Sequence, residues 1–199
     1  MHEIVFMQNP KTMNLNILSK FMLLAQHPNK GRFLIGDLHL NYGIIGAALL
    51  EMSVDEKISI EKDNLILIES QSINPSNSIV VAITAKIKES KKTRKLRYWL
   101  QKLARKSNQY KWIILSDLQE KGVVRIEHKK FLRLFPYKRS YLVENKVRNN
   151  LIEQLRKAAL QSETMTNDTL LMLALVEACK MHKIIASDKR ELKLLRKEL

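Results

Sequence analysis

Residues 43–52 read GIIGAALLEM, and residues 170–176 read LLMLALV. Neither segment leaves much of a polar face at helical spacing, and a helix that is apolar nearly all round must be surrounded by other elements. Two such segments therefore predict central, buried helices that amphipathic helices surround. The 199 residues include 5 glycines and 4 prolines, too few for the many turns of an all-β sandwich.

The segments around these two predict further helices and two hairpins. Apolar residues at helical spacing predict helices at Leu15–Gln26, Thr93–Lys106, Tyr110–Lys121, Asn145–Leu160 and Asp188–Leu199. Alternation and turn signals predict hairpins over Lys57–Ile68 and Val123–Phe135, the second turning at His128-Lys129-Lys130. Segment Ile79–Ile87 fits a strand or a helix face, and its β-branched residues favour strand. The predicted fold is mainly α, a single domain over residues 1–199, with two short β-hairpins.

The positive charge is concentrated in two segments. The chain carries 35 Lys and Arg against 20 Asp and Glu, a formal net charge of +15. Residues 86–111 hold a net +10 and residues 125–148 a net +6, so the remainder is near neutral. Such an excess predicts a surface that faces an anionic partner, either nucleic acid or lipid head groups. We expect its cations to converge on one exposed face, Arg94, Lys102, Lys111 and Lys130 among them.

The helix predicted at Thr93–Lys106 separates charge from apolar residues. At about 100° per residue, four apolar side chains share one arc, and Arg94, Arg97, Lys102 and Arg105 fill the opposite side. Lys111 instead shares a face with the apolar residues of the next helix. Either its stem packs while the amine reaches solvent, or it is a cation at a pocket rim near a helix N-terminus, which would suit a phosphate.

Motifs for catalysis and metal binding are absent from the sequence. It contains no Gly-x-Ser-x-Gly segment and no glycine-rich phosphate loop. Cys179 and His182 supply half a zinc site without a second pair, so we expect a buried cysteine beside a surface histidine. We therefore expect no enzyme, no catalytic residue, no metal and no cofactor.

The sequence also gives an expectation for the compartment. A single cysteine cannot form an intrachain disulfide. The N-terminus lacks the pattern of a signal peptide, and no apolar run approaches the roughly 20 residues that cross a bilayer. We expect a cytoplasmic protein that associates peripherally with membranes.

Four segments in order resemble the Golgi phosphoprotein 3 family. They read GIIGAALLEMSVDEKISI, INPSNSIVVAITAKIKES, LQEKGVVRIEHKKFLRLFP and LVENKVRNNLIEQLRKAAL, and the likeness covers Leu15–Met181. The resemblance implies a largely helical fold around a buried bundle, with a helix rather than a strand at Ile79–Ile87. It also implies a peripheral membrane protein that binds phosphatidylinositol 4-phosphate through an aromatic residue and several arginines.

The family's head-group residues can be carried over by position. Lys111 and Asn108 stand at the family's arginine pair before EKGV, and Ile45 stands at the arginine of the buried helix. The aromatic residue falls at Ile35 or Gly36. Of these positions only Lys111 keeps a charge, and it lacks the bidentate geometry of arginine.

The leading hypothesis is a peripheral membrane-binding module for anionic lipid head groups. The candidate head-group residues are Lys111, Asn108, Arg94, Arg97, Lys102 and Arg105. Apolar residues of the first hairpin (Ile60, Leu65, Leu67) either insert into lipid or pack in the core or in a homo-oligomer.

Two other functions compete with membrane binding. One is a winged-helix nucleic-acid-binding protein with Lys129 and Lys130 at the wing tip. Asp117 and Glu120 argue against it, because these acids on the second helix would face the phosphates. The other is a basic scaffold for an acidic protein partner.

Overall fold

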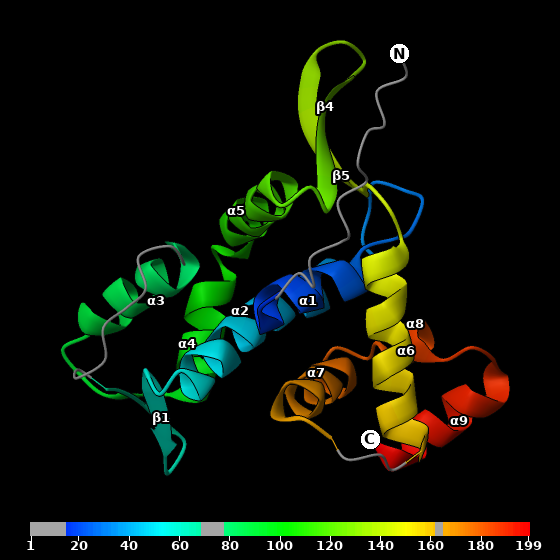
Figure 1. Cartoon of the computed structure of the whole chain (residues 1–199). Coiled ribbons are helices and arrows are strands. Elements are labelled where there is room, and N and C mark those ends of the chain that lie inside the picture. Colours follow the sequence, from blue (N-terminus) through cyan, green and yellow to red (C-terminus); the bar gives the residue numbers. More distant parts are fainter. Residues whose placement is uncertain (1–14, 69–77, 162–164) are drawn as a thin grey trace, which may run out of the picture.

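The computed structural model describes residues 15–68, 78–161 and 165–199 and is mainly helical, as predicted (Figure 1). Its helices are α1 (Ile17–Ala25), α2 (Asp37–Val54), α3 (Ser78–Lys88), α4 (Leu96–Ala104), α5 (Ser107–Glu120), α6 (Lys146–Gln161), α7 (Asn167–Ala178), α8 (His182–Ile185) and α9 (Lys189–Glu198). Its strands are β1 (Ile58–Glu61), β2 (Asn64–Leu67), β3 (Arg94–Lys95), β4 (Val124–Phe131) and β5 (Phe135–Leu142).

Helix α2 occupies the centre of the molecule, which confirms the prediction from GIIGAALLEM. It contacts α1, α4, α5 and α7, and the side chains of Ile44, Ile45 and Met52 are fully buried. Gly43 makes the closest approach, because a Cβ built there would lie 2.1 Å from Cζ of Phe21 on α1. Only a glycine allows the two helices to pack at this separation.

The second apolar segment, in α7, is only partly central. Met172, Leu173 and Val176 are buried against the core, but Leu170 is 56% exposed. Helix α7 packs against α1, α2 and α6, which leaves another side in solvent. The prediction of an enclosed helix is therefore wrong for α7, because an apolar composition does not show how many neighbours a helix has.

Segment Ile79–Ile87 forms helix α3, as the family resemblance implies and against the strand that its β-branched residues favour. Ile79, Ile83 and Ile87 are buried at helical spacing, whereas Val81, which a strand would place on the same face, is exposed. Burial of one helical face outweighs the weak intrinsic preference of these β-branched residues for a strand.

Both predicted hairpins are present, with differences in detail. Strands β1 and β2 pair as expected, with Ile58 opposite Leu67, and the short β3 joins β2 as a third strand that the sequence did not predict. The second hairpin, β4–β5, is longer than predicted. His128-Lys129-Lys130 lies within β4 rather than in the turn, and the chain reverses at Leu132 and Arg133, both with positive φ.

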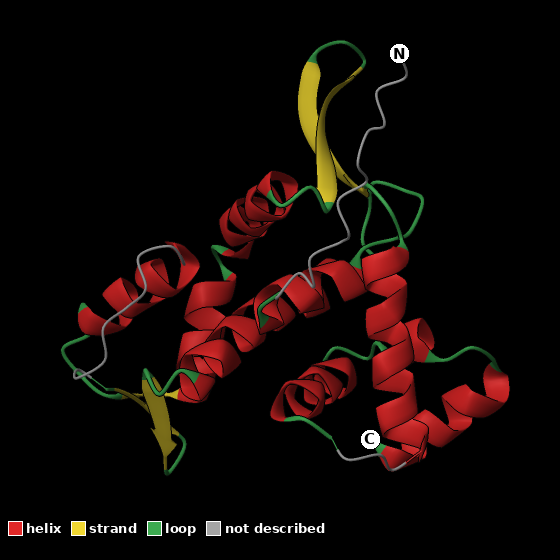
Figure 2. Ribbon diagram, viewed as in Figure 1, coloured by secondary structure: helices red, strands yellow, loops and turns green. Residues whose placement is uncertain are grey.

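The two hairpins project from opposite ends of the helical body (Figures 1 and 2). The base of the second hairpin is fixed to the end of α1 through Gln26, whose side-chain amide donates to the carbonyl oxygen of Ser140 on β5. The Ser140 hydroxyl donates in return to Oε1 of Gln26 at 3.2 Å. The loop between α1 and α2 also packs here, since Gly31 lies against Tyr141.

Candidate functional site

The turn of the second hairpin exposes a compact group of large apolar side chains. Phe131, Leu132, Leu134 and Phe135 are 61%, 68%, 76% and 61% exposed. We call residues 131–135 the hairpin tip. Scattered exposed apolar residues are normal, but four within five residues at the end of a projecting hairpin mark an interaction surface.

The strands behind the tip are strongly basic. Arg125 and Lys129 both pair with Glu127, at 2.8 and 3.0 Å, and Lys129 also donates to the Tyr141 hydroxyl at 3.0 Å. These hydrogen bonds, first to Tyr141 and then to Glu127, raise the pKa of Lys129. Four further cations of the hairpin are exposed and form no ion pair with a described residue: Lys130, Arg133, Lys138 and Arg139.

A second group of charges surrounds Trp112 beside the hairpin. The Nζ atom of Lys111 lies 5.4 Å from the centre of the Trp112 ring, and Nζ of Lys138 lies 5.7 Å from it. Burial lowers the pKa of Lys111, and the nearby carboxylate of Asp37, the first residue of α2, opposes this. We call these four residues the Trp112 cluster. Lys111 therefore has a half-buried stem, as the first of its two alternatives expects, and its amine lies beside Trp112.

The cations of α4 form a separate group around Tyr98. The guanidinium carbon of Arg94 lies 5.0 Å from the Tyr98 ring centre, and Nζ of Lys102 lies 5.4 Å from it. Arg97, Arg105 and Asn108 are exposed and form no ion pair with a described residue. The described contacts therefore join Arg94 with Lys102 and place Lys111 in another cluster.

Lys138 belongs to the Trp112 cluster, and we did not predict it as a site residue from the sequence. The reason is the wrong prediction of the turn. A turn at residues 128–130 leaves Lys138 beyond the predicted hairpin, which ended at Phe135. With the turn at residues 132–134, Lys138 pairs with His128 across the ladder. The long-range contact to Trp112 has no local signal in the sequence.

A family model described as Golgi phosphoprotein 3 matches residues 17–199. The chain belongs to the Golgi phosphoprotein 3 family. No curated protein matches the chain at the threshold applied. Membership of this family supports a Golgi-associated peripheral protein. None of the described helices is long and apolar enough to cross a bilayer.

The resemblance assigns the family's head-group contacts to Lys111, Asn108, Ile45, and Ile35 or Gly36, and these residues are not equally accessible in the structure. Ile45, at the position of the family's buried-helix arginine, is fully buried in α2 and cannot contact a ligand. Ile35 and Gly36, at the position of the aromatic residue, immediately precede Asp37 of the Trp112 cluster.

Three smaller sequence expectations can also be compared with the structure. In the first hairpin Leu65 is buried, so the hairpin packs on the core through this residue, and Ile60 is half exposed. The order of α4, α5 and the second hairpin is that of a winged helix, but the tip is apolar, and Lys129 and Lys130 lie within β4. Cys179 is buried as expected, whereas His182 is also buried and bonds to Glu177 at 2.6 Å.

Proposed function

We propose that the chain is a peripheral membrane-binding protein that attaches to anionic lipid head groups through its second hairpin. The observation that carries this proposal is the apolar hairpin tip with exposed cations within and behind it that form no ion pair with a described residue. Such a combination suits the boundary between lipid head groups and acyl chains, where apolar side chains insert and cations meet phosphates.

The magnitudes are sufficient for reversible attachment. Each Lys or Arg near an anionic leaflet contributes about 1 kcal/mol, so the four unpaired cations of the hairpin supply about 4 kcal/mol. Insertion of four large apolar side chains adds a contribution of similar order. Neither part alone gives stable attachment, so both are required.

The Trp112 cluster is the proposed contact for an individual head group. Lys111 and Lys138 present two cations beside an indole ring, next to the base of the hairpin. Asn108 is exposed one turn before Lys111 on α5. Membership of the Golgi phosphoprotein 3 family supports phosphatidylinositol 4-phosphate as the proposed head group. Arg94 on β3, Arg97 and Lys102 on α4, and Arg105 at the C-terminal end of α4 are proposed as additional cations for anionic lipid.

The test is cosedimentation with vesicles of three compositions: phosphatidylcholine alone, with phosphatidylserine, and with phosphatidylinositol 4-phosphate. We expect binding to the two anionic compositions, strongest to the third, and a decrease with salt. Leu132→Ser with Leu134→Ser removes the two most exposed of the four apolar side chains of the tip. The matched control is Val54→Ser with Ile60→Ser, because Val54 and Ile60 are 53% and 50% exposed near the first hairpin.

Loss of binding in the tip variant but not in the control supports the proposal. Equal binding of the native chain to neutral and anionic vesicles at low salt rejects it. A greater loss in the control would assign insertion to the first hairpin instead. Duplex DNA and the mass of the free protein in solution are measured in parallel, since binding to DNA with a steep salt dependence would favour the nucleic-acid hypothesis. A stable homo-oligomer that buries the tip would contradict insertion.

A further inference from the structure

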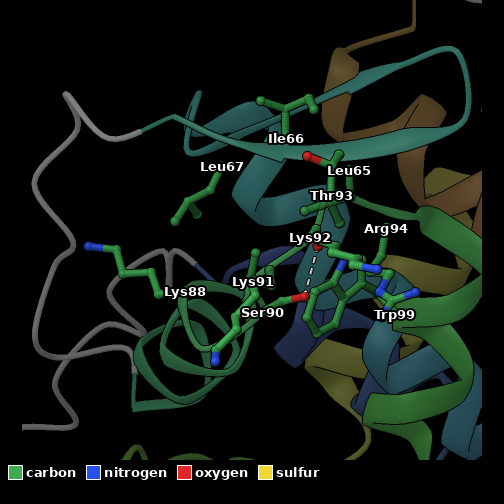
Figure 3. A pocket seen from close by; sticks show the side chains of 11 residues that line it. Leu65, Ile66, Leu67, Lys88, Ser90, Lys91, Lys92, Thr93, Arg94 and Trp99 are labelled. Atoms are coloured by element: carbon green, nitrogen blue, oxygen red, sulfur yellow. Dashed lines mark hydrogen bonds between the residues drawn. The ribbon is translucent and has the colours of Figure 1, made fainter.

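A cavity of about 460 Å³ lies beside the first hairpin, away from the hairpin tip. It is formed by β2, the C-terminal end of α3, the segment that joins α3 to β3, and the start of α4. In Figure 3 the side chains of Lys88 and Lys91 lie on one side of the cavity, and Arg94 and Trp99 on the other. Leu67 and its neighbours on β2 form an apolar wall above them.

The lining of this cavity carries four cations and no carboxylate. The cations are Lys88, Lys91, Lys92 and Arg94, and none of them forms an ion pair with a described residue. The adjacent acid, Glu89, does not line the cavity and accepts from Lys86 at 2.8 Å. Four positive charges therefore gather around one cavity without a described counter-charge, which favours an anion inside it.

The helix dipole accounts for the position of only one of these four cations, Lys88. Lys88 stands in the last turn of α3, where a positive side chain complements the helix dipole. Lys91, Lys92 and Arg94 follow the helix and have no such role. Between them the chain turns, with the Ser90 hydroxyl donating to the carbonyl oxygen of Lys92 at 2.8 Å. This turn holds the cations at the mouth of the cavity.

Trp99 supplies an independent observation. Its side chain is 1% exposed and lines the cavity, and its indole N–H has no hydrogen-bond acceptor among the described residues. A buried donor without a partner is unfavourable and is rare in folded proteins. Trp99 therefore places a buried donor without a described partner in the wall of the cavity that carries the cations.

We propose that this cavity binds a phosphomonoester group, with the phosphate between the lysines and Arg94 and the attached moiety against Leu67 and Trp99. A phosphate offers several strong acceptor oxygens and up to two negative charges, which matches clustered ammonium and guanidinium donors. The site is distinct from the hairpin tip and the Trp112 cluster, and it shares only Arg94 with the cations proposed for anionic lipid. The proposal therefore goes beyond the proposed membrane contact and does not depend on it.

The test uses Trp99 as the reporter. The chain has 2 tryptophans, so Trp112→Phe leaves Trp99 as the single one, and its emission is followed during titration with glycerol 3-phosphate. Lys91→Gln with Lys92→Gln removes two cations of the cavity, and Lys193→Gln with Lys197→Gln removes two exposed cations of α9 as the matched control. We expect saturable binding that is at least about tenfold weaker in the first pair and unchanged in the second. Absence of saturation, or equal weakening in both pairs, overturns the proposal.

A second arm separates a lipid source of the phosphomonoester from a soluble one. If the group belongs to a lipid, glycerol 3-phosphate displaces the protein from vesicles that contain phosphatidylinositol 4-phosphate, and the Lys91/Lys92 pair weakens vesicle binding. If the phosphomonoester belongs to a soluble compound, neither glycerol 3-phosphate nor the Lys91/Lys92 substitutions change vesicle binding. The tip variant Leu132→Ser with Leu134→Ser should retain glycerol 3-phosphate binding, so failure of the membrane proposal is distinguishable from failure of this one.

Discussion

Gln26 and Ser140 stand 114 positions apart in the sequence and form two reciprocal hydrogen bonds in the buried base of the second hairpin. The pair joins the end of α1 to β5, so the direction in which the hairpin projects is determined by the helical core. A hairpin attached only through its own strands would lack this support, because an isolated two-stranded hairpin is marginally stable.

Replacement of Gln26 by Ala should lower the free energy of unfolding by about 1–3 kcal/mol, because the buried carbonyl oxygen of Ser140 loses its donor. Ser140→Ala should lower the free energy of unfolding by less, since the backbone carbonyl of residue 140 still accepts from Gln26. A double-mutant cycle measured by urea denaturation should give a coupling of at least about 0.5 kcal/mol. Additive effects would show that the two side chains do not act as a unit.

Gly43 and Gly46 lie one turn apart on α2 and should respond oppositely to the same substitution. Gly43→Ala should destabilise the fold by about 1–3 kcal/mol, because the new methyl group would overlap Phe21 and Cys179. Gly46→Ala should stabilise it by up to about 1 kcal/mol through helix propensity, since its nearest neighbour would be Leu175 Cδ2 at 3.6 Å. Thermal denaturation of both variants tests this difference. Similar melting temperatures would contradict the close packing at Gly43.

Glu51 should make the stability of the protein decrease as the pH rises. Burial raises the pKa of this carboxyl above 4.5, against the hydrogen bonds from Leu18 N and Asn16. The folded state therefore binds the proton more tightly than the unfolded state, and this contribution to stability, present at low pH, is lost as the pH rises through the folded pKa. Glu51→Gln should gain stability relative to the native chain between about pH 5 and about pH 8. A constant difference across this range would refute the assignment.

Lys111→Met should separate stability from membrane binding. Burial disfavours the charged amine, so a methionine that keeps the stem should leave stability unchanged or raise it by up to about 1 kcal/mol. The same change should weaken binding to phosphatidylinositol 4-phosphate vesicles about fivefold, as expected for one cation at an anionic surface. Lys121→Met, on the same helix but paired with Asp117, is the control and should bind as the native chain does. Equal losses in both variants would remove Lys111 from the proposed site.

Cys179 should be almost unreactive in the folded protein. Burial raises the pKa of its thiol to about 11, so the nucleophilic thiolate is scarce at neutral pH. Labelling with a thiol reagent should be slow in buffer and should accelerate when urea unfolds the chain. Rapid labelling under native conditions would show that the contact between α2 and α7 opens frequently.

The sequence predicted features that depend on local pattern. The apolar run containing Ile44 and Ile45 identified the central helix, and the spacing of Leu96, Trp99 and Leu103 correctly indicated a basic amphipathic helix. Residues 79–87 show the limit of propensity, since alternation and helical periodicity coincide there and only the tertiary contacts or the family likeness decide between them.

The candidate site was harder to predict, for two physical reasons. The turn at Leu132 and Arg133 uses positive φ values in residues that rarely adopt them, so the usual turn residues gave no signal and the apolar tip was missed. The contacts of Trp112 with Lys138, and of Arg94 with the cavity beside β2, join segments that are distant in the chain or separated by a turn. Such contacts depend on the packing of whole elements.

Helix α2 also determines how far apart the two ends of this molecule stand. Its first residue adjoins Lys111, its last turn leads into β1, and its 18 residues span about 27 Å. That span exceeds the screening length of about 8 Å at physiological ionic strength several times over. A leaflet placed across one end of the helix would therefore be screened from the other end. A bilayer that contacts both the β4–β5 hairpin and the cations beside the first hairpin would have to run along α2.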